Sequence, residues 1–183
     1  PVETRHVLME NCEAHGASDA GIYVGQSSDV LVRNCLATYN VAGYEFENTY
    51  RAIFEYNVAT KNTGGFLIFD LPNLRQYGEK NIVRYNKAYA NNTDNFAPIG
   101  NIVGLTPRGT GMLILASDQL EISFTLETDH QGVVVTLEKS PSLQPGSWVL
   151  VPTIASPPIG TSQIHRATIP ANASHEFYRL IAR

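Results

Sequence analysis

The chain has 183 residues, of which 43% are apolar and 16% charged, and a formal net charge of −4 at pH 7. This length suffices for a substantial core, and the composition is that of a folded protein with little charge. The negative balance gives no reason to expect nucleic acid or an anionic membrane as a partner, and no stretch approaches the roughly 18 apolar residues that predict a transmembrane helix.

The chain opens on Pro1 within a running pattern and has neither an initiator methionine nor a signal peptide. We therefore expect an N-terminally truncated part of a longer protein, in which the missing signal peptide says nothing about export. Upstream sequence would also cover the apolar end of the first repeat.

Asparagine recurs along the first part of the chain at spacings of 23, 23 and 29 residues, at Asn11, Asn34, Asn57 and Asn86. Aligning these residues gives two upstream apolar columns: Val7, Val30, Ile53 and Ile82 in one, and Leu8, Leu31, Phe54 and Val83 in the next. Cys12 and Cys35 also lie one repeat apart. This spacing predicts two stacked thiols, because a disulfide between in-register parallel neighbours has awkward geometry.

Glycine forms a further column, at Gly21, Gly43, Gly65 and Gly111. The residues one and three positions after each glycine are apolar in all four copies, whereas the residue between them varies: Tyr23, Glu45, Leu67 and Leu113. This period of two predicts strands with one buried face. The glycines suit corners that need a positive φ, and asparagine tolerates a left-handed turn and can bond to its copies above and below.

Strands that repeat every 22 or 23 residues, separated by short polar turns, predict a coil of stacked parallel strands. We expect about four coils within residues 1–118. Two insertions, residues 71–78 and residues 93–110, interrupt the repeat, and loops of this length in a compact coil are usually functional or serve as packed covers.

Residues 5–117 resemble the right-handed parallel β-helix repeat proteins, the broad group that contains pectate lyases and mannuronan C5-epimerases. The stretches ASDAGIYVGQSSDVLVRNC, NTGGFLIFDLPNL and NTDNFAPIGNIV are similar, more narrowly, to a bacterial β-helix repeat family without a settled activity. The resemblance implies an all-β fold and a secreted, periplasmic or cell-surface protein that contacts polysaccharide. The Asp-Pro-His-Glu signature of alginate epimerases and the aspartate cluster of pectate lyases are absent, which counts against carrying over either activity.

The asparagine and glycine pattern stops near residue 118, and residues 119–183 form a second predicted domain. Residues 120–138 alternate as two strands joined by a turn at residues 129–132. This part resembles the small antiparallel β-sandwich-like module that ends many secreted bacterial proteins and acts as a connector, anchor or sorting element. The resemblance rests on residues 137–138, Ser140, Leu143, Trp148 and residues 177–180.

The outward strand face offers Glu45 and Glu47, two positions apart on one strand and therefore about 7 Å from each other. We expect them to form the floor of a groove bounded by the two insertions, together with Tyr23 one coil before and Asp70 one coil after. Phe69 could stack on a sugar ring. The carboxylate pair could hold calcium or bind sugar hydroxyls, although a solvated strand face is the simpler interpretation. No metal site is assigned.

The leading hypothesis is contact with polysaccharide, neutral or acidic, by binding rather than catalysis, because no complete set of acid, base and charge-neutralising groups is visible. A second hypothesis is a uronate lyase or C5-epimerase, in which Arg75 or Arg108 neutralises the carboxylate and Tyr23 or His15 transfers the proton. A third is a surface scaffold or stalk without a ligand. Calcium is the one cofactor considered.

Overall fold

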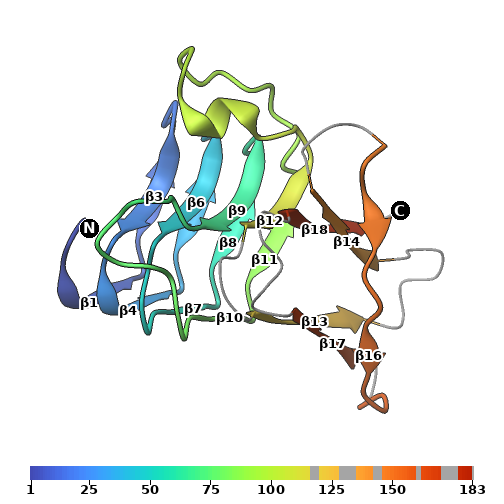
Figure 1. Cartoon of the computed structure of the whole chain (residues 1–183). Helices are drawn as coiled ribbons and strands as arrows, with labels where there is room; N and C mark the ends of the chain where they lie inside the picture. The colour runs from blue at the N-terminus through green and yellow to red at the C-terminus, as the bar shows by residue number, and fades with distance from the viewer. Residues whose placement is uncertain (116–119, 128–134, 142–145, 160–161, 170–176, 183) are drawn as a thin grey trace.

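The computed structural model describes residues 1–115, 120–127, 135–141, 146–159, 162–169 and 177–182. In Figure 1 the strands of residues 1–115 stack side by side into a coil, with the N-terminus at one end of the stack and the C-terminal strands at the other. Each coil gives one strand to each of three parallel sheets. The predicted parallel β-helix of about four coils is therefore confirmed.

Sheet 1 contains β1 (Arg5–Glu10), β4 (Ser28–Arg33), β7 (Ile53–Glu55) and β10 (Ile82–Arg84). Sheet 2 contains β2 (Glu13–His15), β5 (Leu36–Thr38), β8 (Val58–Thr60) and β11 (Lys87–Tyr89). The coil's part of sheet 3 contains β3 (Ala20–Gly25), β6 (Ala42–Glu47), β9 (Gly64–Phe69) and β12 (Thr110–Leu115). The short 3-10 helix η1 (Ile102–Leu105) lies within the second insertion.

The inward side chains of the sheets meet in one core along the axis of the coil. Tyr44 stacks on Phe66 one coil away, with ring centroids 4.6 Å apart, and Phe46 of sheet 3 stacks on Phe54 of sheet 1. All four rings are fully buried. Burial of such large rings supplies most of the hydrophobic stabilisation, and the period-2 columns that predicted it are confirmed.

The predicted register of sheet 1 is right between the first two coils and wrong by one residue at the third. Val7 pairs with Val30 as expected, but Phe54 pairs with Val32 instead of Leu31. Alternation explains the difference, because Val30, Val32 and Phe54 all point into the core and only the shifted register keeps them in line. Asn57 consequently lies beside Cys35, not Asn34.

The cysteines behave as predicted. The pairing of Glu13 with Leu36 places Cys12 beside Cys35, and both thiols are free. The amide oxygen of Asn57 accepts the backbone N–H of Cys35 at 3.1 Å, so the thiol column continues into an asparagine column. Burial, first of all, raises the pKa of the Cys35 thiol.

The glycine column is aligned as predicted, but its physical reason is different. Gly21, Gly43, Gly65 and Gly111 are absent from the glycines with positive φ. A Cβ on Gly43 would lie 2.7 Å from the carbonyl oxygen of Gly65 and 3.0 Å from Nδ2 of Asn62. Glycine is therefore required by the close approach of the next coil and of an asparagine amide, and not by a left-handed backbone.

That amide belongs to a buried ladder formed by Asn40, Asn62 and Asn91, which the sequence analysis did not identify. Oδ1 of Asn62 accepts the backbone N–H of Asn40 at 2.9 Å, and Oδ1 of Asn91 accepts that of Asn62 at 3.1 Å. Nδ2 of Asn62 also donates to the carbonyl oxygen of Ala37 and to Oδ1 of Asn91. Each coil is thus bonded to the next through side chains that replace backbone bonds at the corner.

The C-terminal strands pair antiparallel. Sheet 3 continues beyond β12 through β18 (Phe177–Ala182), β14 (Val135–Ser140) and β15 (Val149–Leu150). A separate sheet contains β13 (Leu120–Glu127), β17 (Ser162–Ile169) and β16 (Ile154–Ala155). The two strands predicted within residues 120–138 exist as β13 and β14 but belong to different sheets.

Three sequence predictions concern this C-terminal part. The predicted turn at residues 129–132 and the predicted domain boundary at residue 118 lie outside the described residues. The resemblance of residues 119–183 to a C-terminal module stays a prediction.

Candidate functional site

The outward face of sheet 3 carries the residues predicted as a groove floor. Tyr23 pairs with Glu45 and Glu45 with Leu67, as expected, and Glu47 pairs with Phe69. The two insertions lie at opposite ends of these strands. We call residues 93–110 the strap and residues 71–78 the corner loop (Figure 1). The sequence thus placed this column correctly on the outward face.

The expectation that Glu45 and Glu47 lie in solvent is wrong. Their exposed fractions are 4% and 7%. The strap packs Val103 into a second apolar cluster with Leu67 on this face, which excludes water from the strands beneath. Phe69 is half-buried and packs against the same cluster, so it is not an open sugar platform. The strap is a cover, one of the two roles expected for such an insertion.

Glu47 is held by two donors from the preceding coil. The hydroxyl of Tyr23 donates to its Oε2 at 3.1 Å, and Nε2 of Gln26 donates to its Oε1 at 2.8 Å. Burial and then the charge of Glu47 raise the pKa of Tyr23 above its usual value. The Tyr23 hydroxyl therefore stays protonated at neutral pH and serves as a donor to Glu47, which disfavours the predicted role as a catalytic base.

Glu45 has no hydrogen-bond partner among the described residues. Burial, then the charges of Asp19 and Glu47, raise its pKa from 4.5 to about 8, so it is mostly neutral at pH 7. Calcium sites use several ionised oxygens. In the described parts of the chain no group of three or more His, Cys, Asp or Glu side chains could hold a metal ion. The arrangement gives the proposed calcium role of Glu45 and Glu47 no support.

The remaining predicted residues are spread over the molecule. His15 ends β2 on sheet 2, whereas Tyr23 lies on sheet 3. Nη1 of Arg108 on the strap forms a 2.6 Å ion pair with Asp94, and Arg75 lies on the corner loop. Because these groups come from separate faces and loops, the structure does not assemble the acid, base and neutralising set of a lyase or epimerase.

Asp70 acts within the chain. Its Oδ2 accepts the backbone N–H of Gly78 at 2.8 Å and thereby closes the corner loop. This contact occupies the Asp70 carboxylate at the base of the loop.

The sequence analysis missed a group of exposed tyrosines beside sheet 2. Tyr39, Tyr56, Tyr85 and Tyr89 are each more than half exposed, and we call this group with the outward side of sheet 2 the tyrosine face. Tyr56 stacks on Tyr85 of the next coil at 5.0 Å. The 29-residue spacing of these two tyrosines, which equals that of Asn57 and Asn86, was the available signal.

Two of these tyrosines have an unusual backbone. The register places Asn34, Tyr56 and Tyr85 in one corner column, with φ values of 54°, 57° and 57°. Asparagine adopts this left-handed conformation at little cost, whereas a bulky aromatic residue there is uncommon and strained. Coils 3 and 4 therefore keep an exposed aromatic ring at a corner where asparagine would fit more easily.

Sheet 2 between the tyrosines is open and mixed in character. Its inward side carries alanines such as Ala37 and Ala59, while Lys87 and His15 lie exposed on its outward side. Strands of three residues make the face about 10 Å wide. On either side of it lie the stacked pair, which precedes the strands, and Tyr39, which follows β5 and is approached by Lys61 at 5.4 Å.

A family model described as the right handed beta helix region matches residues 2–142. No curated protein and no solved structure matches the chain. Among the helices in the described part of the chain, none has the length and apolar character needed to span a membrane. This family fits at most a polysaccharide-related protein and does not distinguish binding from catalysis. Because the match covers more than half of the sequence, the chain belongs to the family of right-handed β-helix proteins.

Proposed function

We propose that this protein binds polysaccharide through the tyrosine face and does not cleave or epimerise it. The observation that carries the proposal is the exposed Tyr56–Tyr85 pair, held in a left-handed corner where the first two coils have asparagine. Aromatic rings present large, rigid surfaces that pack against sugar rings, and their hydroxyls bond to sugar hydroxyls. A strained residue that is retained at the surface points to a ligand and not to packing.

Binding is preferred to catalysis because the candidate catalytic groups are occupied or far apart. The Tyr23 hydroxyl donates to Glu47, and Arg108 is paired with Asp94. Secretion from a bacterium, or display in the periplasm or on the cell surface, forms part of the proposal and rests on the resemblance stated above.

Replacing both tyrosines by asparagine tests the proposal, because asparagine is the residue that coils 1 and 2 use at this corner. The double variant Tyr56→Asn/Tyr85→Asn should fold at least as well as the parent, since the strain at the corner is relieved. Its retention on the polysaccharide that the parent binds should fall about tenfold or more, because each lost aromatic contact is worth roughly 1 kcal/mol. A glycan array with and without calcium, followed by affinity electrophoresis, measures this.

Tyr77→Ala is the matched control, because Tyr77 is also about half exposed but lies on the corner loop. It should bind like the parent. A blank array from folded parent protein would contradict polysaccharide binding and favour a scaffold. Undiminished binding of the asparagine variant would exclude the tyrosine face.

A further inference from the structure

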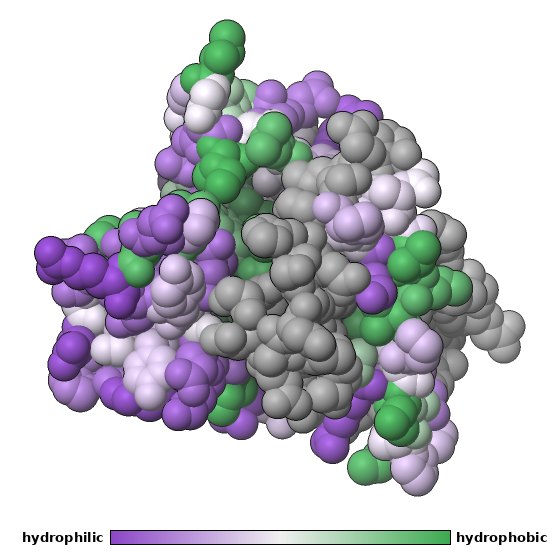
Figure 2. All heavy atoms as spheres, viewed as in Figure 1, coloured by the Kyte–Doolittle hydropathy of each residue, from purple (hydrophilic) through white to green (hydrophobic). Residues whose placement is uncertain are grey.

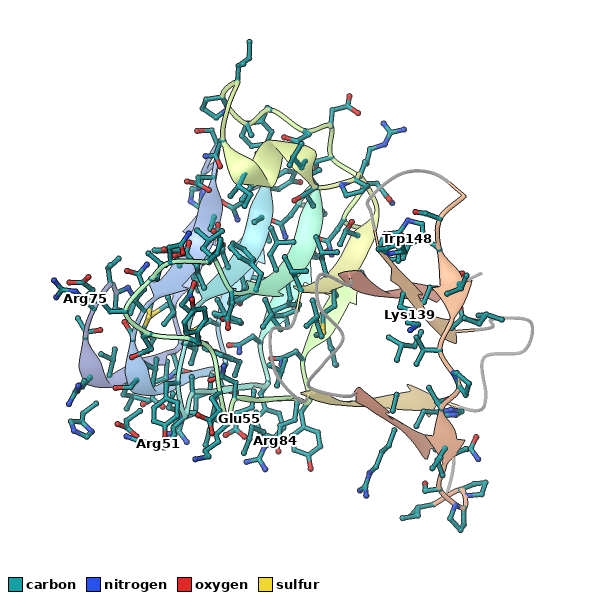
Figure 3. All side chains as sticks on the ribbon, viewed as in Figure 1. Arg51, Glu55, Arg75, Arg84, Lys139 and Trp148 are labelled. Atoms are coloured by element: carbon teal, nitrogen blue, oxygen red, sulfur yellow. The ribbon has the colours of Figure 1, made fainter. Side chains whose placement is uncertain are left out.

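A cavity of about 240 Å³ lies near the N-terminal end of the coil, where the start of β1 meets the corner loop. Arg5 and Ser28 line it from sheet 1, Gln26 lines it from the end of β3, and Arg75 and Gln76 line it from the corner loop. Figure 3 shows Arg75 extending from the loop toward the N-terminal edge of the stack. The site is separate from the tyrosine face, which lies along sheet 2.

The corner loop is fixed in place by a buried asparagine. Asn48 is fully buried, and its Nδ2 donates to the carbonyl oxygens of Leu71 at 3.0 Å and Gln76 at 2.8 Å. Its Oδ1 accepts the N–H of Leu71 at 2.8 Å. Nε2 of Gln76 in turn donates to the carbonyl oxygens of Asn48 and Ser27. The backbone on either side of Arg75 is therefore pre-organised beside the cavity.

The two arginines of the cavity differ from every other arginine in residues 1–115. Four arginines there form ion pairs of 2.6–2.7 Å with carboxylates: Arg33, Arg51, Arg84 and Arg108. Figure 3 shows two of them, Arg51 and Arg84, near Glu55 on the lower edge of the coil. Arg5 and Arg75 make no ion pair with a described residue, although Glu3 also lines the cavity. Unpaired guanidinium groups at one concave site attract an anion.

We propose that this cavity binds one carboxylate or sulfate group carried by a ligand of about the size of one sugar residue. The volume is below the roughly 300–1,000 Å³ of sites for drug-sized ligands, so a single charged group or ring fits and a long segment does not. The planar guanidinium fork bonds to the two oxygens of a carboxylate or sulfate in parallel. The inference goes beyond the proposed function, because it assigns a second site with a charged ligand.

Titration of the protein with glucuronate, glucose and inorganic sulfate, followed by NMR chemical-shift changes, tests the site. Glucuronate should bind, glucose should not, and the affinity should fall with added salt. The double variant Arg5→Gln/Arg75→Gln should weaken glucuronate binding about tenfold or more. Arg108→Gln, which removes an exposed arginine already paired with Asp94, should leave it unchanged.

Both exposed arginines can be replaced without disturbing the core, and circular dichroism verifies the fold of each variant. Equal binding of glucuronate and glucose, or undiminished glucuronate binding by the double variant, would overturn the proposal. Sulfate that binds as tightly as glucuronate would support the anion site and refute its selectivity for a sugar acid. Tyr56→Asn/Tyr85→Asn should not alter glucuronate binding, so failure of the polysaccharide proposal and failure of this site are separable.

Discussion

Replacing Asn62 by alanine is expected to lower the free energy of unfolding by about 3 to 5 kcal/mol, a large part of the stability of a protein of this size. The side chain is fully buried in the middle of the Asn40–Asn62–Asn91 ladder. Its loss leaves the backbone N–H of Asn40 without a partner, and such a buried donor costs about 1–3 kcal/mol. The other lost bonds and the small cavity add to this cost. Urea unfolding followed by far-UV circular dichroism measures the change.

Asn62→Asp separates the role of the donor from that of the acceptor. Aspartate keeps an oxygen for the N–H of Asn40 but places a carboxylate against the oxygens of Ala37 and Asn91. It should therefore be strongly destabilising at pH 7 and recover partly at low pH, where the protonated acid donates again. Asn92→Ala, at an exposed position of the same turn, is the control and should cost less than 0.5 kcal/mol. A loss below about 1 kcal/mol in Asn62→Ala would contradict the ladder's structural role.

The coil was predictable from sequence because stacked coils must match each other, and its errors arise where two repeats compete. The asparagine spacing of 23 and the glycine spacing of 22 cannot both hold through the second coil. The turn after β2 spans residues 16–19 and the turn after β5 spans residues 39–41, so the register shortens there by one residue. Identity between Asn34 and Asn57 was misleading, whereas the inward alternation of Val32 and Phe54 was decisive.

The buried ladder was missed because an asparagine of a core ladder and one of an exposed turn look alike in a single sequence. The glycines opposite it were the indirect signal. Gly43 has an ordinary backbone and is required by the Asn62 amide and the next coil, which appears only when the coils are stacked.

The candidate site was less predictable, because burial of an outward face depends on where an insertion packs. The period of two placed Glu45 outward correctly, but it says nothing about the strap. Leu67 and Leu113 in the same column were the local signal of a cover, since apolar residues on an open face are costly. The unpaired state of Arg75 likewise depends on contacts between distant segments that spacing does not reveal.

The pH dependence of stability is expected to carry a large contribution from Glu45. Its pKa is raised from 4.5 to about 8 in the folded protein, by burial first and then by Asp19 and Glu47. Below pH 4.5 the carboxyl is protonated in both states and this contribution to stability is fully present. As the pH rises from about 4.5 to about 8, the unfolded chain ionises while the folded protein holds the proton. The contribution is then lost, by on the order of 4 kcal/mol in total, and changes little above pH 8.

Glu45→Gln isolates this effect, because glutamine has the shape of the protonated acid and does not titrate. Urea unfolding of the parent and the variant at pH 5, 6, 7 and 8 should give two curves that separate steadily, with the variant more stable at pH 8. Other groups, such as Asp29, whose pKa Arg51 lowers, titrate alike in both proteins and cancel in the difference. Glu13→Gln, on the exposed side of β2, should run parallel to the parent. If Glu45→Gln also runs parallel, Glu45 is ionised and solvated in the folded protein. The strap would then not seal this face, and the outward side of sheet 3 would return as a place for ligand.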